Sequence, residues 1–117
     1  MRLLSTVAVI ALTTCSLFAI EGAYTISGQD PYEKAPYTGT AVITKEGDVY
    51  QGQWSFDDKE KYVGTGLKNG NEVSFIFQKD DKTLSGVQVY KIDGTTLSGP
   101  WVLLGKSLIG TEKMQKQ

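Results

Sequence analysis

The chain has 117 residues and a formal net charge of −1, with 13 glycines, 3 prolines, one cysteine and no histidine. This length supports one domain, and the near-neutral charge argues against a nucleic-acid partner, which normally leaves a strongly basic signature. The absence of histidine excludes Ser-His-Asp and Cys-His nucleophilic sites and histidine-ligated zinc. Because the adjacent aspartates at 57–58 and 80–81 fall in predicted turns, where they usually bond to the local backbone, we expect no enzyme, no metal and no cofactor.

Residues 1–19 have the plan of a secretory signal peptide: Arg2, an apolar run over residues 3–12, and a favoured cleavage site after Ala19. Three less favoured alternatives are a cut after Ser16, lipid attachment at Cys15, and a membrane anchor formed by residues 3–20. We therefore predict a secreted or periplasmic protein, with a single domain over residues 20–117, no membrane span after cleavage, and no disulfide in the exported part.

A short sequence motif, a large apolar residue two positions before a glycine, recurs along the rest of the chain. Its clearest copy is Tyr50-Gln51-Gly52, and the copies follow at steps of 11 to 13 residues, one of them doubled. One strand plus one tight turn has this length. The pattern predicts strands at residues 24–28, 37–44, 49–56, 61–68, 72–78, 84–92, 97–104 and 108–114.

The predicted connections are short, and no stretch has helical periodicity. Asn69-Gly70 and Asp93-Gly94 are two-residue hairpin signals. The longest loop is expected at Gln29 to Pro36, as a connector or as a flap over one end of the fold. We predict an all-β fold, a small eight-stranded antiparallel up-and-down barrel similar in plan to lipocalin and avidin barrels, which removes exposed strand edges.

Six glycines share the inward phase of the predicted strands. They have two possible causes, sharp bending of the strands or space left for a ligand beside aromatic side chains. Because the strands are short, we expect an interior that is filled or nearly so. The six are Gly39, Gly52, Gly64, Gly86, Gly99 and Gly110.

The candidate ligand-binding residues are the inward-phased aromatic and polar side chains. They are Tyr50, Trp54, Tyr90, Trp101, Gln88 and Glu112. A buried carboxylate without a partner is costly, so Glu112 either reaches water near its strand end, which we favour, or makes a polar contact at the mouth of a pocket.

An apolar set is expected on the outward phase of the last strands: Val87, Val89, Val102, Leu104 and Ile109. A contiguous patch of this kind usually marks a partner surface. It predicts self-association through residues 84–110.

Three segments, at residues 37–45, 62–66 and 108–113, together resemble small exported bacterial proteins of poorly defined function, some of which are labelled fibronectin-binding protein. This resemblance supplies no site residues. The leading functional expectation is an exported, non-enzymatic binding barrel that holds a small apolar ligand or a protein partner. The alternatives are a structural or adhesive envelope protein, and an enzyme inhibitor that acts through the loop at 29–36.

Overall fold

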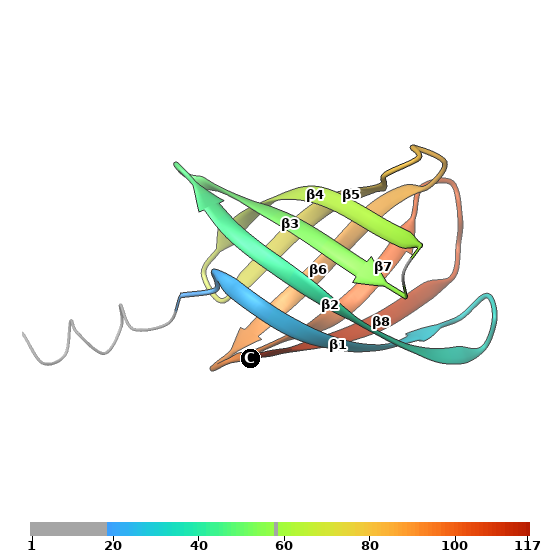
Figure 1. Cartoon of the computed structure of the whole chain (residues 1–117), viewed down its shortest axis with the longest axis horizontal. Coiled ribbons are helices and arrows are strands. Elements are labelled where there is room, and N and C mark those ends of the chain that lie inside the picture. The colour runs from blue at the N-terminus through green and yellow to red at the C-terminus, as the bar shows by residue number, and fades with distance from the viewer. Residues whose placement is uncertain (1–18, 58) are drawn as a thin grey trace, which may run out of the picture.

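The protein is described here by a computed structural model that covers residues 19–57 and 59–117. Its eight strands form one closed antiparallel barrel in sequence order (Figure 1). The strands are β1 (Gly22–Asp30), β2 (Ala35–Glu46), β3 (Val49–Phe56), β4 (Glu60–Asn69), β5 (Glu72–Lys79), β6 (Ser85–Asp93), β7 (Thr96–Leu103) and β8 (Ile109–Lys116). The predicted fold class and all eight strands are confirmed, while most of the predicted signal peptide lies outside the described residues.

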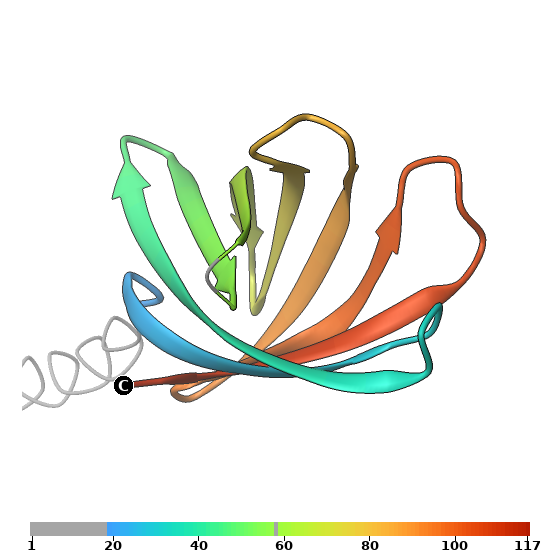
Figure 2. The same cartoon turned by 45° about the vertical axis from the view of Figure 1, so that its right-hand side comes forward.

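The barrel closes where β1 pairs with β8, so that the first and last strands lie side by side (Figure 2). The described residues contain no helix, and hence none that is long and apolar enough to cross a membrane. Every strand pairs with two neighbours, so no strand is an edge strand along its whole length.

Three two-residue turns connect the strands at one end of the barrel, which we call the base. Each begins with a glycine of positive φ, Gly47 at 60°, Gly70 at 65° and Gly94 at 61°. Positive φ at the first central residue alone is the type II′ arrangement, which suits the twist of a hairpin. The second hairpin therefore turns at residues 70–71, with Asn69 paired to Glu72, one residue later than the Asn-Gly signal indicated.

The four longer connections lie at the opposite end, which we call the mouth (Figure 1). The long loop expected at Gln29 to Pro36 is wrong, because Gln29 pairs with Pro36 and only residues 31–34 form the turn. Asp30 stabilises this turn by accepting a hydrogen bond from the Tyr32 amide at 2.8 Å. Since β3 pairs with β2 only from Thr40 onward, Pro36 lies on a locally unpaired edge, where a missing N–H is tolerated.

Apolar side chains fill the half of the barrel nearest the base. Ile20, the first residue of the predicted domain, is only 1% exposed, and its carbonyl accepts a hydrogen bond from the Tyr24 hydroxyl at 2.8 Å. Around it lie the other fully buried members of the core: Ile43, Val73, Phe75, Tyr90, Leu97 and Met114. Ile20 thus anchors the segment before β1 to the core.

The six predicted glycines lie on the inward phase, buried or half-buried, and aromatic rings pack directly on most of them. A Cβ added at Gly39 would lie 2.7 Å from the Phe56 ring, and one at Gly86 would lie 2.7 Å from the Phe77 ring. Side chains at these positions would collide with the rings. Most glycines of this row therefore make room for aromatic rings that pack against the barrel wall. This reason for the glycines differs from the two expected from the sequence.

Candidate functional site

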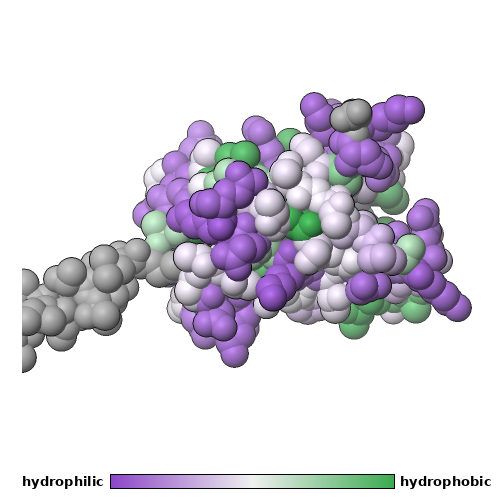
Figure 3. All heavy atoms as spheres, turned by 60° about the horizontal axis from the view of Figure 1, so that its bottom comes forward, coloured by the Kyte–Doolittle hydropathy of each residue, from purple (hydrophilic) through white to green (hydrophobic). Residues whose placement is uncertain are grey.

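A cavity of about 700 Å³ opens at the mouth of the barrel. The expectation of a filled interior is therefore wrong for this half. The physical reason is the placement of the rings, which lie against glycines of the barrel wall and leave the axis open. Figure 3 shows hydrophilic side chains on both sides of a notch at this end of the molecule.

Glu112 lies in the wall of this cavity, at the centre of one row of paired residues. The row runs from Tyr37 on β2 through Gly28 on β1 to Glu112 on β8 and on to Gly99 on β7. A Cβ at Gly28 would collide with the Tyr37 ring, so the glycine lets that ring cross β1. The Tyr37 hydroxyl then donates a hydrogen bond to Glu112 Oε1 at 2.9 Å.

Tyr90 reaches Glu112 from the other side, across Gly99. A Cβ at Gly99 would lie 3.4 Å from the Tyr90 Cα. The Tyr90 hydroxyl donates a hydrogen bond to Glu112 Oε2 and accepts one from Trp54 Nε1 at 3.0 Å. Both carboxyl oxygens are thus held by a tyrosine, and Gly28 is the residue that makes room for the Tyr37 ring.

Glu112 is 7% exposed, so the expectation that it reaches water at its strand end is wrong. Burial raises the pKa of its carboxyl above the ordinary value, and the two tyrosine hydroxyls oppose this rise. Burial also raises the pKa of Tyr90 and of Tyr37 far above that of free tyrosine, and the neighbouring Glu112 charge raises both further. The two hydroxyls therefore remain protonated donors.

Gln88 also faces inward, as predicted, but its amide nitrogen serves the backbone. The β6–β7 ladder lacks two pairs after Gln88↔Trp101, at the point where Pro100 has no N–H to donate. Gln88 Nε2 lies 3.1 Å from each of the carbonyl oxygens of Val89, Gly99 and Pro100 and donates to them. The Gln88 side chain thus supplies hydrogen bonds to backbone carbonyls where the pairing of β6 and β7 is interrupted beside the cavity.

Five aromatic rings form a chain of edge-to-face contacts in the cavity wall. The successive rings are Trp101, Tyr37, Phe56, Tyr62 and Phe77, with centroid separations of 6.4, 5.4, 5.8 and 5.7 Å. The indole N–H of Trp101 lies near the Tyr37 hydroxyl and opposes the rise in the Tyr37 pKa. Trp101 Nε1 is nevertheless buried without a hydrogen-bond partner among the described residues. The wall is therefore rich in aromatic rings, and polar groups, including tyrosine hydroxyls and carboxylates, lie among them.

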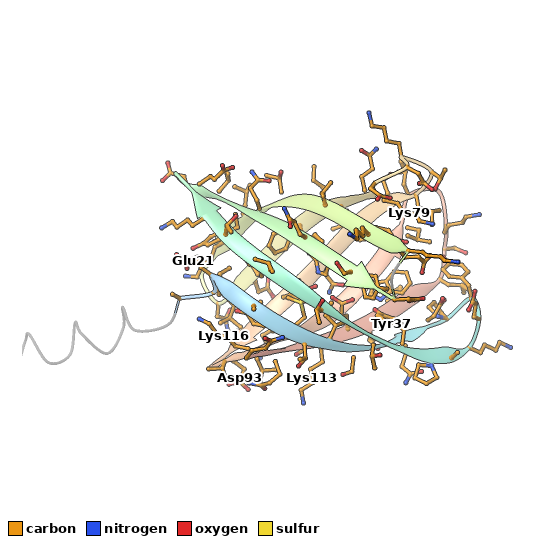
Figure 4. The ribbon with its side chains drawn as sticks, viewed as in Figure 1. Glu21, Tyr37, Lys79, Asp93, Lys113 and Lys116 are labelled. Carbon is orange, nitrogen blue, oxygen red and sulfur yellow. The ribbon has the colours of Figure 1, made fainter. Side chains whose placement is uncertain are left out.

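The rim of the cavity is acidic. Asp30, Glu33, Asp57 and Glu60 line it, against one lysine, Lys106. Burial and then the Glu60 charge raise the pKa of Tyr62 to about 12. Figure 4 shows Tyr37 and Lys79 toward this end of the molecule. Lys79 Nζ forms an ion pair with Glu60 Oε2 at 3.5 Å. Within residues 19–57 and 59–117, no three such acidic groups come close enough together to hold a metal ion.

Of the six residues predicted to bind a ligand, the structure brings five together around this cavity. Tyr50 is the exception, because it is buried outside the cavity, with Lys45 Nζ 5.9 Å from its ring centroid. Four aromatic residues of the wall were not among the predicted site residues: Tyr37, Phe56, Tyr62 and Phe77. Their signal was present in the sequence, since each of the four follows the alternation of inward-facing residues along its own strand.

The outer face carries the predicted apolar set in paired register. Ile76 pairs with Val87, Val87 with Val102, and Val102 with Ile109, which makes one row across four strands. A shallow groove of about 710 Å³ includes the first three members of this row and Leu104, whereas Ile109 lies outside it. Val89 is half-buried and lies outside the groove.

No family model matches the chain, and no curated protein matches it. Solved structures do. One is a de novo designed fluorescence-activating β-barrel, with 12% identity, a TM-score of 0.62, and coverage of 83% of this chain and 93% of that one. Another is the REP1-NXSQ fatty acid transporter, with 11% identity, a TM-score of 0.55, and coverage of 83% and 95%. At these identities the likeness shows the shared barrel fold.

Proposed function

We propose that this protein is an exported, non-enzymatic barrel that holds a small ligand in the cavity at its mouth. The observation that carries the proposal is a cavity of about 700 Å³ with an aromatic wall and one buried carboxyl held by two tyrosines. Small-molecule sites have volumes of roughly 300–1,000 Å³, apolar walls and a few placed polar groups.

The solved barrels add support of a general kind, since one is titled as a fatty acid transporter and the other as fluorescence-activating. Export is supported by the sequence of residues 1–19 alone. The inhibitor alternative loses its main support, because the loop proposed for it is a four-residue turn.

Tryptophan fluorescence tests the proposal, because Trp54 and Trp101 both line the cavity. Titration with a panel of lipids and hydrophobic dyes should change the emission and saturate. Leu103→Phe places a ring in the cavity and should weaken binding, whereas Val102→Phe, the neighbouring residue on the outer groove, should not. Equal effects of the two variants, or unchanged emission with every compound, would refute the proposal.

A second candidate function, self-association, is favoured by the outer apolar row. The occupant we propose is a second copy of the chain, because the row carries no charged side chain and two copies can meet there without opposing like charges. Sedimentation velocity should show a dimer that Val87→Lys abolishes and Ser27→Lys, on the outer face of β1, leaves intact. A strict monomer at high protein concentration would exclude this candidate.

A further inference from the structure

Glu112 is a buried carboxylate without a cationic partner. Among the described residues the only ion pairs join Lys79 to Glu60 and to Asp81, so no ammonium group of residues 19–57 and 59–117 pairs with Glu112. Two tyrosine hydroxyls supply hydrogen bonds but no positive charge. A buried charge of this kind is costly unless a counter-ion reaches it, and the cavity is the side from which one can come.

The walls above Glu112 suit the same kind of ion. An organic cation is attracted to aromatic rings when it lies within about 6 Å of a ring centroid, and rings of this type form the cages that bind quaternary ammonium ligands. Tyr37, which bonds to Glu112, belongs to the chain of five rings in the wall. A cation beside the carboxyl therefore meets an aromatic surface as well.

The rim adds a third, independent feature. Four carboxylates and one lysine line the entrance, although the whole chain has a net charge of only −1. Glu60 is paired with Lys79, but the residues that line the entrance still carry more negative than positive charge, which raises the local concentration of cations and speeds their entry. A ligand with a carboxylate head would meet like charge at the rim and again at Glu112.

We propose that the cavity binds organic ammonium ions that carry an apolar body, with Glu112 as the counter-ion and the aromatic wall around the cationic head. This inference rests on the proposed function, because it names the ligand class of the same cavity. The apolar body would lie among the aliphatic side chains that line the cavity, such as Leu84 and Leu103.

The test uses three probes with one alkyl chain: decyltrimethylammonium, decanol and decanoate, each below its micelle concentration. Tryptophan emission should show the ammonium binding about tenfold or more tighter than the alcohol, with decanoate weakest. Glu112→Gln should reduce ammonium affinity to that of the alcohol and leave the alcohol unchanged.

The rim provides a second set of variants in case Glu112→Gln does not fold. Asp57→Asn and Glu33→Gln, both at exposed positions, should weaken ammonium binding and reduce its salt dependence. Alcohol or decanoate binding as tightly as the ammonium would overturn the cation inference and leave the proposed function standing. If none of the three probes binds, the cation inference fails, and the proposed function fails with it when the panel of lipids and dyes also leaves the emission unchanged.

Discussion

Removal of the Tyr90 hydroxyl should destabilise the barrel far more than removal of the Tyr37 hydroxyl, although both donate to the same carboxyl. The Tyr90 hydroxyl serves two buried groups, Glu112 Oε2 and Trp54 Nε1. Tyr90→Phe loses a bond to a charged group, about 1.5–3 kcal/mol, and leaves a buried N–H without a partner, about 1–3 kcal/mol. The expected loss in the free energy of unfolding is about 2.5–6 kcal/mol.

Tyr37→Phe is the matched variant, because it removes a hydrogen bond to Glu112 Oε1 at 2.9 Å and a longer one to the exposed Thr111 carbonyl at 3.4 Å, but leaves no buried N–H without a partner. Tyr37 is half-buried and lines the cavity, so that water can replace its hydroxyl, and we expect a loss of about 1 kcal/mol. Urea unfolding followed by far-UV circular dichroism is the suitable assay, because the fluorescence of Trp54 would change through the lost contact itself.

Two further measurements sharpen this comparison. In a Glu112→Gln background, the cost of Tyr90→Phe should change by about 0.5–3 kcal/mol, because the two residues share a hydrogen bond. The slope of the unfolding free energy against urea should stay constant. Equal losses for Tyr90→Phe and Tyr37→Phe would refute the assignment of Tyr90 as the shared partner of Glu112 and Trp54.

Three other predictions concern the base, the glycine row and alkaline pH. Ile20→Ala should cost about 2–5 kcal/mol in equilibrium unfolding and Ile76→Ala, 66% exposed, less than about 1 kcal/mol, and similar losses would contradict the core described here. Gly110→Ala places a methyl group against the Trp101 indole and should cost about 1–3 kcal/mol in the same assay. An unchanged free energy of unfolding would contradict the packing of the aromatic rings on the glycines. Burial raises the pKa of Tyr24 to about 12, so the unfolded chain releases that proton first, and melting temperatures should fall as pH rises above the ordinary tyrosine value of 10.0; constant melting temperatures would contradict this.

The strands and their inward phase could be predicted because one short sequence motif recurs at a spacing equal to the length of one strand plus one turn. The cavity could not be predicted from that repeat. Whether an inward ring lies across the axis or against the wall depends on its neighbour in the next strand, such as Gly28 beside Tyr37. A sequence gives no register between strands, and the register decides this choice.

Glu112 shows the same limit more sharply. Its partners lie on β2 and β6. Tyr37 on β2 meets Glu112 only because β1 closes against β8 with Gly28 opposite Glu112, whereas Tyr90 on β6 reaches it across β7. A shift of one residue in that pairing would turn the carboxyl outward. β1 and β8 are far apart in the sequence, and hairpin signals give no information about the pairing of such strands. The position of Glu112 near the end of its predicted strand was therefore the only guide, and it wrongly indicated that the carboxyl reaches water.

The most direct test of this account is the titration of Glu112 by NMR, with its side-chain carboxyl carbon observed in the free protein and with decyltrimethylammonium bound. Tyr37 and Tyr90 are the titratable groups bonded to it, and both stay protonated through the acid range. In the free protein the Glu112 pKa should lie above the ordinary value of 4.5, because the carboxyl is buried, and a bound ammonium ion should lower it. An ordinary pKa that the ammonium does not move would contradict both the buried carboxyl and its role as a counter-ion.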